Sequence, residues 1–345
     1  MGIIGRHSFE LCSRPRIISS ASYVGDKEGK GPLRECFDKI CRDDTLGLDS
    51  WEQAESRMFE SAVRVALAKI KRQSDDLSCL LGGDLLNQII SSGFAAREIR
   101  APFIGLYGAC STISEGLMLG GMLVDGGFAE LAACAASSHF SAAERQFRCP
   151  LEMGVQAVPS SQRTVTGAGS IIIQAAGEFR PGAGNVFEHV ALTGGTIGSV
   201  EDFGITDANN MGAAMAPAAF KTIKAHLSDY SRRVEDYDRI ITGDLGIFGS
   251  DMLYELLRGE GIEIADRHED CGKLMFSPEQ NVNCGASGCG CAATVMSSWF
   301  LPKIESGEIR RVLFLATGAL MSPVSSLQGE SIPSIAHAVV IEHID

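Results

Sequence analysis

The sequence predicts an α/β protein made of two similar halves, and three observations support this prediction. From residue 77 onward, short apolar runs alternate with segments of helical periodicity, which is typical of a sheet covered by helices on both faces. The strand end Leu81-Gly-Gly-Asp84-Leu85 reappears as Ile241-Thr-Gly-Asp244-Leu245. A Gly-Ala-Cys turn at residues 108–110, which precedes a Gly- and Ala-rich helix, reappears as Gly-Ala-Ser at residues 285–287. Because the order is the same in both parts, an internal duplication is predicted.

The chain length agrees with two halves. The protein has 345 residues, enough for about two domains of roughly 150 residues each. We therefore place one half at about residues 1–180 and the other at about residues 181–345.

The elements follow one another in a regular order. Residues 1–48 have mixed composition and predict a short strand and loops. Ser50 and Gln53 form a capping box, and apolar residues recur at three- or four-residue intervals to about Lys71, which predicts an amphipathic helix. The apolar runs that follow predict strands at residues 77–81, 103–107, 131–138 and 312–318, with helical segments at residues 85–96 and 114–123.

Charge and hydropathy exclude two classes of protein. The 43 acidic and 30 basic side chains give a net charge of -13, which repels phosphate backbones, so no nucleic acid partner is expected. Asp125 and Glu130 interrupt the most apolar stretch, residues 116–136, so no transmembrane segment is predicted. The N-terminus shows no signal peptide pattern, and we expect an intracellular protein.

The eleven cysteines argue against disulfides and zinc. Their number is odd and no two of them form a C-x-x-C pair, so free thiols and no metal site are expected. Cys110 is a special case because it lies just before a helix that starts near Thr112. The helix dipole would favour its thiolate and lower its pKa, as in a nucleophile. The alternative is a small residue that fits a tight turn.

Several segments resemble a known superfamily. The turn Gly108-Ala-Cys110-Ser111, the segment Thr166-Gly-Ala-Gly-Ser170 and the segment Asn281-Val-Asn283-Cys-Gly-Ala are similar to motifs of the thiolase superfamily, which includes the ketoacyl-synthase-III-like condensing enzymes. The resemblance implies a thiolase-like fold, in which two βαβαβαββ-type halves form α-β-α-β-α layers. It also implies a pocket where the two halves meet.

Within that superfamily the chain resembles the stage V sporulation protein AD family. The segments that carry this resemblance are residues 82–88, 103–112, 137–148, 211–219, 242–245 and 331–338. The resemblance implies a non-catalytic protein without a cofactor, which binds dipicolinic acid (pyridine-2,6-dicarboxylate) and supports its uptake into the developing spore. It also implies partners among the other stage V sporulation A membrane proteins and a peripheral association with the spore inner membrane.

Two alternative functions remain open. A condensing enzyme or acyltransferase of the ketoacyl-synthase-III type would use Cys110 as its nucleophile, together with two His residues or a His and an Asn. Asp244 stands where the first of these His residues is expected, and an ionised carboxylate cannot donate a hydrogen bond. The third possibility is a scaffold whose pocket is vestigial.

Seven residues are candidates for contact with the ligand, each for a stated reason. Asp84 and Asp244 end equivalent strands, and Asn87 follows the first of them. His139 follows the strand 131–138. Asn283 takes the place of the Asn partner of condensing enzymes, and Cys110 lies in the nucleophile turn. With no third ligand beside the two aspartates, a metal is not expected.

Arg145 is the candidate that would match the charge of the ligand. It lies with Arg148 and Arg163 in a segment that we expect to cross the strand ends as a long loop. A guanidinium binds a carboxylate through two parallel hydrogen bonds, which suits a dicarboxylate. The alternative is an ordinary surface or interface charge.

A homodimer is expected because the superfamily usually pairs its sheets. The small residues of the strand near residues 131–136 would permit close approach of a second copy. Those small residues would equally suit close packing inside one subunit.

Overall fold

The computed structural model describes residues 2–147 and 158–345. Its main strands follow one path of hydrogen-bonded neighbours, in the order β12-β11-β14-β15-β10-β3-β9-β7-β5-β6. In the middle of this path, β10 is joined to β3 by a single residue pair, Ala191 with Arg16. The strands are β3 (Arg16–Val24), β5 (Cys79–Gly83), β6 (Phe103–Gly105), β7 (Leu131–Ser138), β9 (Gly167–Gln174), β10 (Val190–Thr196), β11 (Arg239–Thr242), β12 (His268–Asp270), β14 (Arg311–Ala319) and β15 (Ser334–His343).

The five strands on each side of that junction have the same arrangement. In the first part, β5 pairs in parallel with β6 and β7, and β9 pairs antiparallel with β7 and β3. In the second part, β11 pairs in parallel with β12 and β14, and β15 pairs antiparallel with β14 and β10. Asp84 and Asp244 thus follow equivalent strands, as predicted. The boundary near residue 180 stays a prediction.

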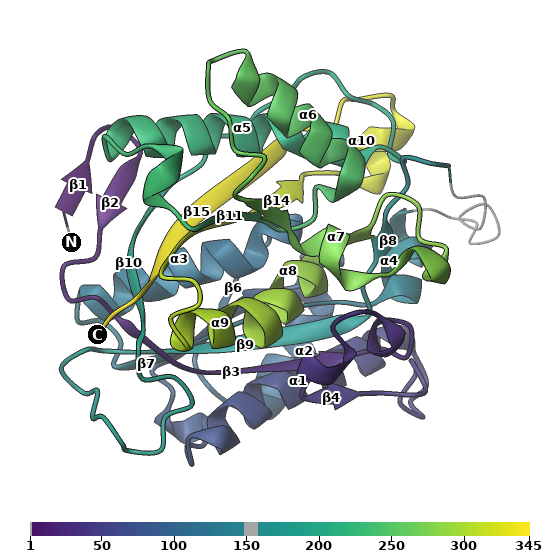
Figure 1. The fold of residues 1–345 in the computed structure, drawn as a ribbon. Coiled ribbons are helices and arrows are strands. Elements are labelled where there is room, and N and C mark those ends of the chain that lie inside the picture. The colour runs from purple at the N-terminus through teal and green to yellow at the C-terminus, as the bar shows by residue number, and fades with distance from the viewer. Residues whose placement is uncertain (1, 148–157) are drawn as a thin grey trace.

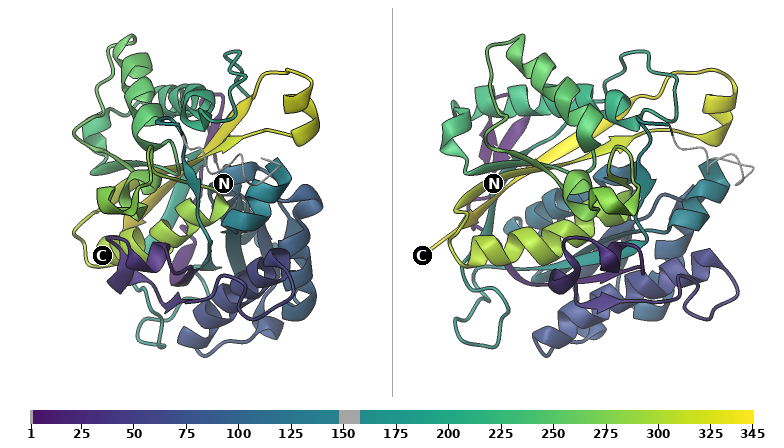
Figure 2. Two further views of the ribbon diagram at one scale, coloured as in Figure 1. Left: turned by 90° about the vertical axis from the view of Figure 1, so that its right-hand side faces the viewer. Right: turned by 45° about the vertical axis from the view of Figure 1, so that its right-hand side comes forward.

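The helices and the two parts of the sheet form the five layers of the expected α-β-α-β-α arrangement (Figure 1). Helices α3 and α8 lie between the two parts, α1 and α2 cover the outer face of the first part, and α5 and α6 cover the outer face of the second (Figures 1 and 2). The helices are α1 (Trp51–Lys69), α2 (Ile90–Ile99), α3 (Thr112–Asp125), α4 (Phe140–Phe147), α5 (Met211–Asp229), α6 (Gly246–Arg258), α7 (Cys271–Met275), α8 (Cys289–Val295), α9 (Leu301–Glu305) and α10 (Pro323–Leu327).

Short strands complete the fold: β1 (Gly2–Ile4), β2 (Ser8–Glu10), β4 (Lys39–Ile40), β8 (Arg163–Thr164) and β13 (Ala286–Ser287). One turn of π-helix, Met296–Phe300, joins α8 to α9. No helix in the described part of the chain has the length and apolar character needed to cross a membrane.

The first long helix forms as its sequence predicts. The Ser50 side chain accepts a hydrogen bond from the backbone N–H of Gln53 and caps α1. Its buried face includes Ala54, Met58 and Ala62, which recur at intervals of four residues. This face packs on the outer side of β3 and β9.

The central layer depends on very close packing between helix and sheet. A Cβ atom added to Gly169 of β9 would lie 2.3 Å from the carbonyl oxygen of Ala293 in α8. A side chain at position 169 would therefore force the central helix away from the strand.

Two expectations about the chain path were incomplete. Within residues 1–48, β3 is a nine-residue central strand rather than a short one, and all nine of its residues are half-buried or buried, so no period-two pattern marks it. The segment expected to be a long loop after His139 contains α4. Arg148 lies outside the described residues.

The expected dimer contact through residues 131–136 is wrong in its location. Both edges of β7 are hydrogen-bonded within the chain, to β5 and to β9, and all eight of its residues are buried. The small residues of β7 serve packing inside the subunit. The free edge at this end of the path belongs to β6, where Ile104 is 42% exposed.

We still propose a homodimer, and we predict that its two copies pair through the edge of β6. An exposed strand edge offers unpaired backbone groups, and a charge on it disfavours pairing. Ile104→Lys should therefore convert the dimer to a monomer in sedimentation measurements at micromolar concentration. Phe128→Lys changes another exposed apolar residue and should leave the dimer intact. A dimer that survives Ile104→Lys would contradict this interface.

Candidate functional site

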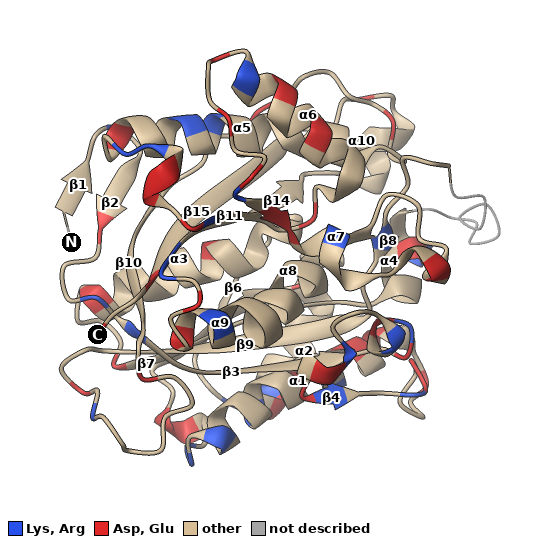
Figure 3. Cartoon of the chain, in the orientation of Figure 1, with Lys and Arg blue, Asp and Glu red and all other residues tan. Residues whose placement is uncertain are grey.

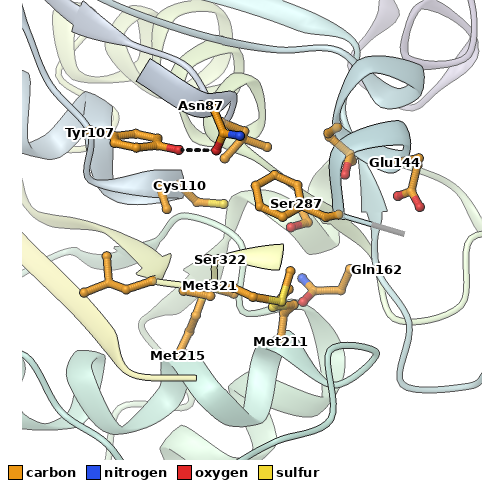
Figure 4. Close-up of a pocket in the computed structure, with 17 residues that line it drawn as sticks. Asn87, Tyr107, Cys110, Glu144, Gln162, Met211, Met215, Ser287, Met321 and Ser322 are labelled. Atoms are coloured by element: carbon orange, nitrogen blue, oxygen red, sulfur yellow. Dashed lines mark hydrogen bonds between the residues drawn. The ribbon is translucent and has the colours of Figure 1, made fainter. Parts of the chain in front are cut away.

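A pocket of about 260 Å³ lies where the two halves of the fold meet. Its walls come from α4 and the Cys110 turn on one side, and from the start of α5 and the end of β14 on the other (Figure 4). The lining is mostly apolar with a few polar groups, and its residues are Leu85, Asn87, Tyr107, Ala109, Cys110, Ala143, Glu144, Phe147, Gln162, Thr164, Met211, Met215, Ser287, Ala319, Leu320, Met321 and Ser322.

Cys110 lies in a strained turn at the start of the central helix. The preceding residue, Ala109, has φ of 50°, in the left-handed region that non-glycine residues rarely adopt. Such strain persists only where the surrounding structure holds it, and it is common at functional sites. The turn places the Cys110 side chain at the pocket wall, as the sequence predicted (Figure 4).

The protonation of Cys110 differs from the prediction. Burial raises the pKa of its thiol well above the usual value, and the nearby Asp244 raises it further. The backbone N–H of Gly288 acts in the opposite direction but does not reverse the shift. The expected lowering by the helix N-terminus is therefore outweighed by burial and by a carboxyl group that accepts a hydrogen bond from the thiol.

Asp244 lies behind Cys110, fully buried, and does not line the pocket. Its carboxyl group accepts hydrogen bonds from the Gly288 N–H at 2.9 Å, the Thr317 hydroxyl at 3.1 Å and the Ser287 hydroxyl at 3.2 Å. Burial nevertheless raises the pKa of Asp244 to about 7. Near neutral pH this position therefore changes between a neutral acid and an anion.

Asp84 and Asn87 have separate roles. Asp84 is buried and accepts hydrogen bonds from the backbone N–H groups of Leu86 at 2.8 Å and Ser92 at 2.7 Å, so it holds the turn after β5. That turn brings Asn87 to the pocket, where its Oδ1 accepts a hydrogen bond from the Tyr107 hydroxyl at 3.5 Å (Figure 4). The Asn87 Nδ2 group has no hydrogen-bond partner among the described residues and can donate to a ligand.

His139 and Arg145 do not reach the pocket. His139 is fully buried, and its Nε2 lies 2.8 Å from the Asp44 carbonyl oxygen. Arg145 points away from the pocket: its guanidinium forms an ion pair with Glu52 and lies over the ring of Trp51, 5.3 Å from the ring centroid. Partners outside the pocket thus hold both side chains, and neither is among the lining residues.

Asn283 also lies outside the pocket. Its Nδ2 donates a hydrogen bond to the Val158 carbonyl oxygen at 2.9 Å on the exposed surface. The structure therefore brings Asn87 and Cys110 together at the pocket, with Asp84 and Asp244 behind it. It leaves His139, Arg145 and Asn283 elsewhere.

Sequence reasoning missed several lining residues. Ser287 occupies the position in the second half that corresponds to Cys110 in the first, so the duplication could have indicated it. Gln162 donates from Nε2 to the carbonyl oxygens of Asp244 at 2.6 Å and Ala286 at 2.9 Å. Its Oε1 is buried and has no partner among the described residues. Tyr107, Met211 and Met215 lie in segments that carry the family resemblance, whereas no sequence signal marks Gln162 or Met321.

The described lining of the pocket contains no Lys or Arg side chain, and Glu144 is its one carboxylic acid. The described ranges 2–147 and 158–345 contain no group of three His, Cys, Asp or Glu side chains arranged to hold a metal ion.

Comparison with known proteins identifies relatives by sequence. The model of the family described as stage V sporulation protein AD matches residues 5–342. The stage V sporulation protein AD of Bacillus subtilis (strain 168) is 43% identical over 343 residues, which cover 99% of this chain and 98% of that protein.

Comparison with solved structures supports the fold. Human mitochondrial 3-ketoacyl-CoA thiolase has a TM-score of 0.59 at 12% identity and covers 98% of this chain and 100% of its own. The 3-oxoacyl-(acyl-carrier-protein) synthase III of Aquifex aeolicus VF5 has a TM-score of 0.58 at 11% identity, covering 95% of this chain and 100% of its own. At these identities the likeness shows a thiolase-like fold and says nothing of activity.

Proposed function

The chain belongs to the stage V sporulation protein AD family, and we propose that it binds dipicolinic acid in the pocket beside Cys110 and supports its uptake into the developing spore. One observation carries the binding proposal: the pocket has the size and the mostly apolar lining of a small-ligand site, and the cysteine at its wall is held as a thiol rather than as a reactive thiolate.

The pocket suits a small planar ligand with polar edges. Tyr107 and Phe147 supply aromatic surface for a pyridine ring. Asn87 and Thr164 are neutral groups that can donate hydrogen bonds to carboxylate oxygens, worth about 1.5 to 3 kcal/mol each when the acceptor is charged. The unpartnered Oε1 of Gln162 would accept a hydrogen bond from a protonated carboxyl group or a water.

The second candidate is an acyltransferase of the ketoacyl-synthase-III type. The contact between the Cys110 thiol and the Asp244 carboxyl group favours it, because a carboxylate can accept a proton. The same carboxylate disfavours the thiolate, and it cannot donate a hydrogen bond to an enolate when ionised. We therefore prefer binding over turnover.

A paired assay on one protein sample separates the candidates. Calorimetry with dipicolinate tests binding, and mass spectrometry after exposure to acyl-coenzyme A tests acylation of Cys110. We expect binding without a mass shift.

Cys110→Ala should change the affinity only modestly, because it removes a small contact worth roughly 1 kcal/mol. An acyl adduct that Cys110→Ala abolishes would establish the enzyme, and absence of both signals would favour a scaffold.

Arg145→Ala should leave dipicolinate affinity within about twofold of the wild type. Its guanidinium is engaged by Glu52 outside the pocket, so its removal takes no hydrogen bond from a ligand there. Arg310→Ala, which removes a surface ion pair with Asp345, is the matched control. A tenfold loss specific to Arg145→Ala in calorimetry would show that the ligand binds beside α4 instead.

We also propose that the protein works at the spore inner membrane with other stage V sporulation A membrane proteins. The family membership supports this proposal. Since no described helix can span a bilayer, the association would be peripheral and carried by protein contacts.

A further inference from the structure

Two segments that are distant in sequence are joined beside the pocket. Residues 197–210 connect β10 to α5, and residues 320–333 connect β14 to β15 through α10. The Ile332 N–H donates to the Ile205 carbonyl oxygen at 2.7 Å, and beside it the Glu201 N–H donates at 2.8 Å to the carbonyl oxygen of Ser334, the first residue of β15. We call these two joined segments the paired flap.

The paired flap exposes apolar side chains that nothing in the described chain covers. Val200 is 55% exposed, Phe203 51%, Val324 65% and Leu327 89%. Helix α10 has no buried residue, so it does not contribute to the core. In the left view of Figure 2 the segment between β14 and β15, which contains α10, extends away from the rest of the molecule. Exposed apolar groups gathered on one projection are typical of an interaction surface.

The charge on the paired flap has one sign. Its ionisable side chains are Glu201, Asp202, Asp207 and Glu330, and it contains no Lys or Arg. Figure 3 shows this absence of basic side chains along α10. Asp202 accepts a hydrogen bond from the Ser331 hydroxyl at 2.6 Å, so one of these acids also helps to join the two segments.

This charge pattern discriminates among possible occupants. An anionic lipid surface would be repelled by four carboxylates. A second copy, joined by a two-fold axis through this surface, would bring the same acids face to face. A polypeptide whose apolar side chains are flanked by Lys or Arg would complement both the apolar and the charged part.

We propose that the paired flap is a docking surface for a basic amphipathic segment of a partner protein. The surface continues into the pocket wall, because Leu320, Met321 and Ser322 line the pocket and lead directly into α10. This inference does not depend on the identity of the pocket ligand.

The test uses a synthetic helical peptide with Leu along one face and Lys along the other, measured by fluorescence anisotropy against the full-length protein. A control peptide keeps each Lys and replaces each Leu with Gln. We expect the Leu/Lys peptide to bind and the Gln/Lys peptide to bind at least about tenfold more weakly, because it lacks the apolar contacts.

Variants place the binding on the paired flap. The double variant Phe203→Ser and Leu327→Ser should weaken peptide binding about tenfold or more, whereas Phe128→Ser, at a residue 82% exposed elsewhere, should not change it. Glu330→Lys should weaken binding and reduce its salt dependence. All four positions are exposed, and melting curves check that each variant is folded.

Three results would overturn the proposal. The first is peptide affinity that is the same in the wild type, the double variant and the Glu330→Lys variant. The second is binding to phosphatidylglycerol vesicles that requires Leu327, which would indicate a membrane surface. The third is self-association of the protein that Leu327→Ser abolishes, which would indicate a second copy.

Discussion

Ala319→Trp should abolish dipicolinate binding, weakening it by at least about 100-fold. Ala319 ends β14 and lines the pocket opposite the Cys110 turn. The volume available there is about 260 Å³, and an indole group at this position would fill much of it. Because the side chain is partly exposed, the larger residue should not disrupt the core. Calorimetry with dipicolinate measures the effect.

Ala68→Trp is the matched control for this experiment. Ala68 lies on the exposed face of α1, remote from the lining residues, so the same change of side chain should leave affinity unaltered. Equal affinity in Ala319→Trp and the wild type, with both proteins folded, would place the ligand outside this pocket. Loss of affinity in both variants would point to a general effect of the indole group.

The parts of the site that could be predicted are those that the duplication repeats. The pocket between the halves was implied by the resemblance to the thiolase superfamily. The repeated strand ends indicated equivalent places for Asp84 and Asp244, and the repeated turn placed Cys110 at the start of a helix. Such features follow from local sequence, since the end of a strand and the start of a helix have recognisable patterns.

The orientation of polar side chains could not be predicted in the same way. Arg145 directly follows the pocket residue Glu144 in α4, but Glu52 and Trp51, about 90 residues earlier in the chain, hold it on the outside. The pKa of Cys110 depends on Asp244, which the fold brings from the other half. Both outcomes are decided by contacts between distant residues, which spacing along the chain does not reveal.

Asp244→Asn should change the pH dependence of stability. The pKa of Asp244 is raised from an ordinary value near 3.8 to about 7 by burial, so the folded protein holds a proton that the unfolded chain releases between about pH 4 and pH 7. Wild-type stability therefore loses a contribution as pH rises through this window, on the order of 4 kcal/mol in full. An Asn cannot ionise, and its Oδ1 can still accept from the Gly288 N–H while Thr317 turns its hydroxyl to accept from Nδ2.

Melting temperatures measured from pH 5 to pH 8.5 should show the variant gaining on the wild type as pH rises, with the difference levelling off above about pH 8. Glu28, whose buried carboxyl group also has a pKa raised to about 7, is present in both proteins, so its contribution cancels in the difference. A difference that stays constant across the range would mean that Asp244 is ionised throughout. In that case four donors, including the Cys110 thiol, would be sufficient to stabilise the buried anion, and a dicarboxylate in the pocket would face a permanent negative charge behind Cys110.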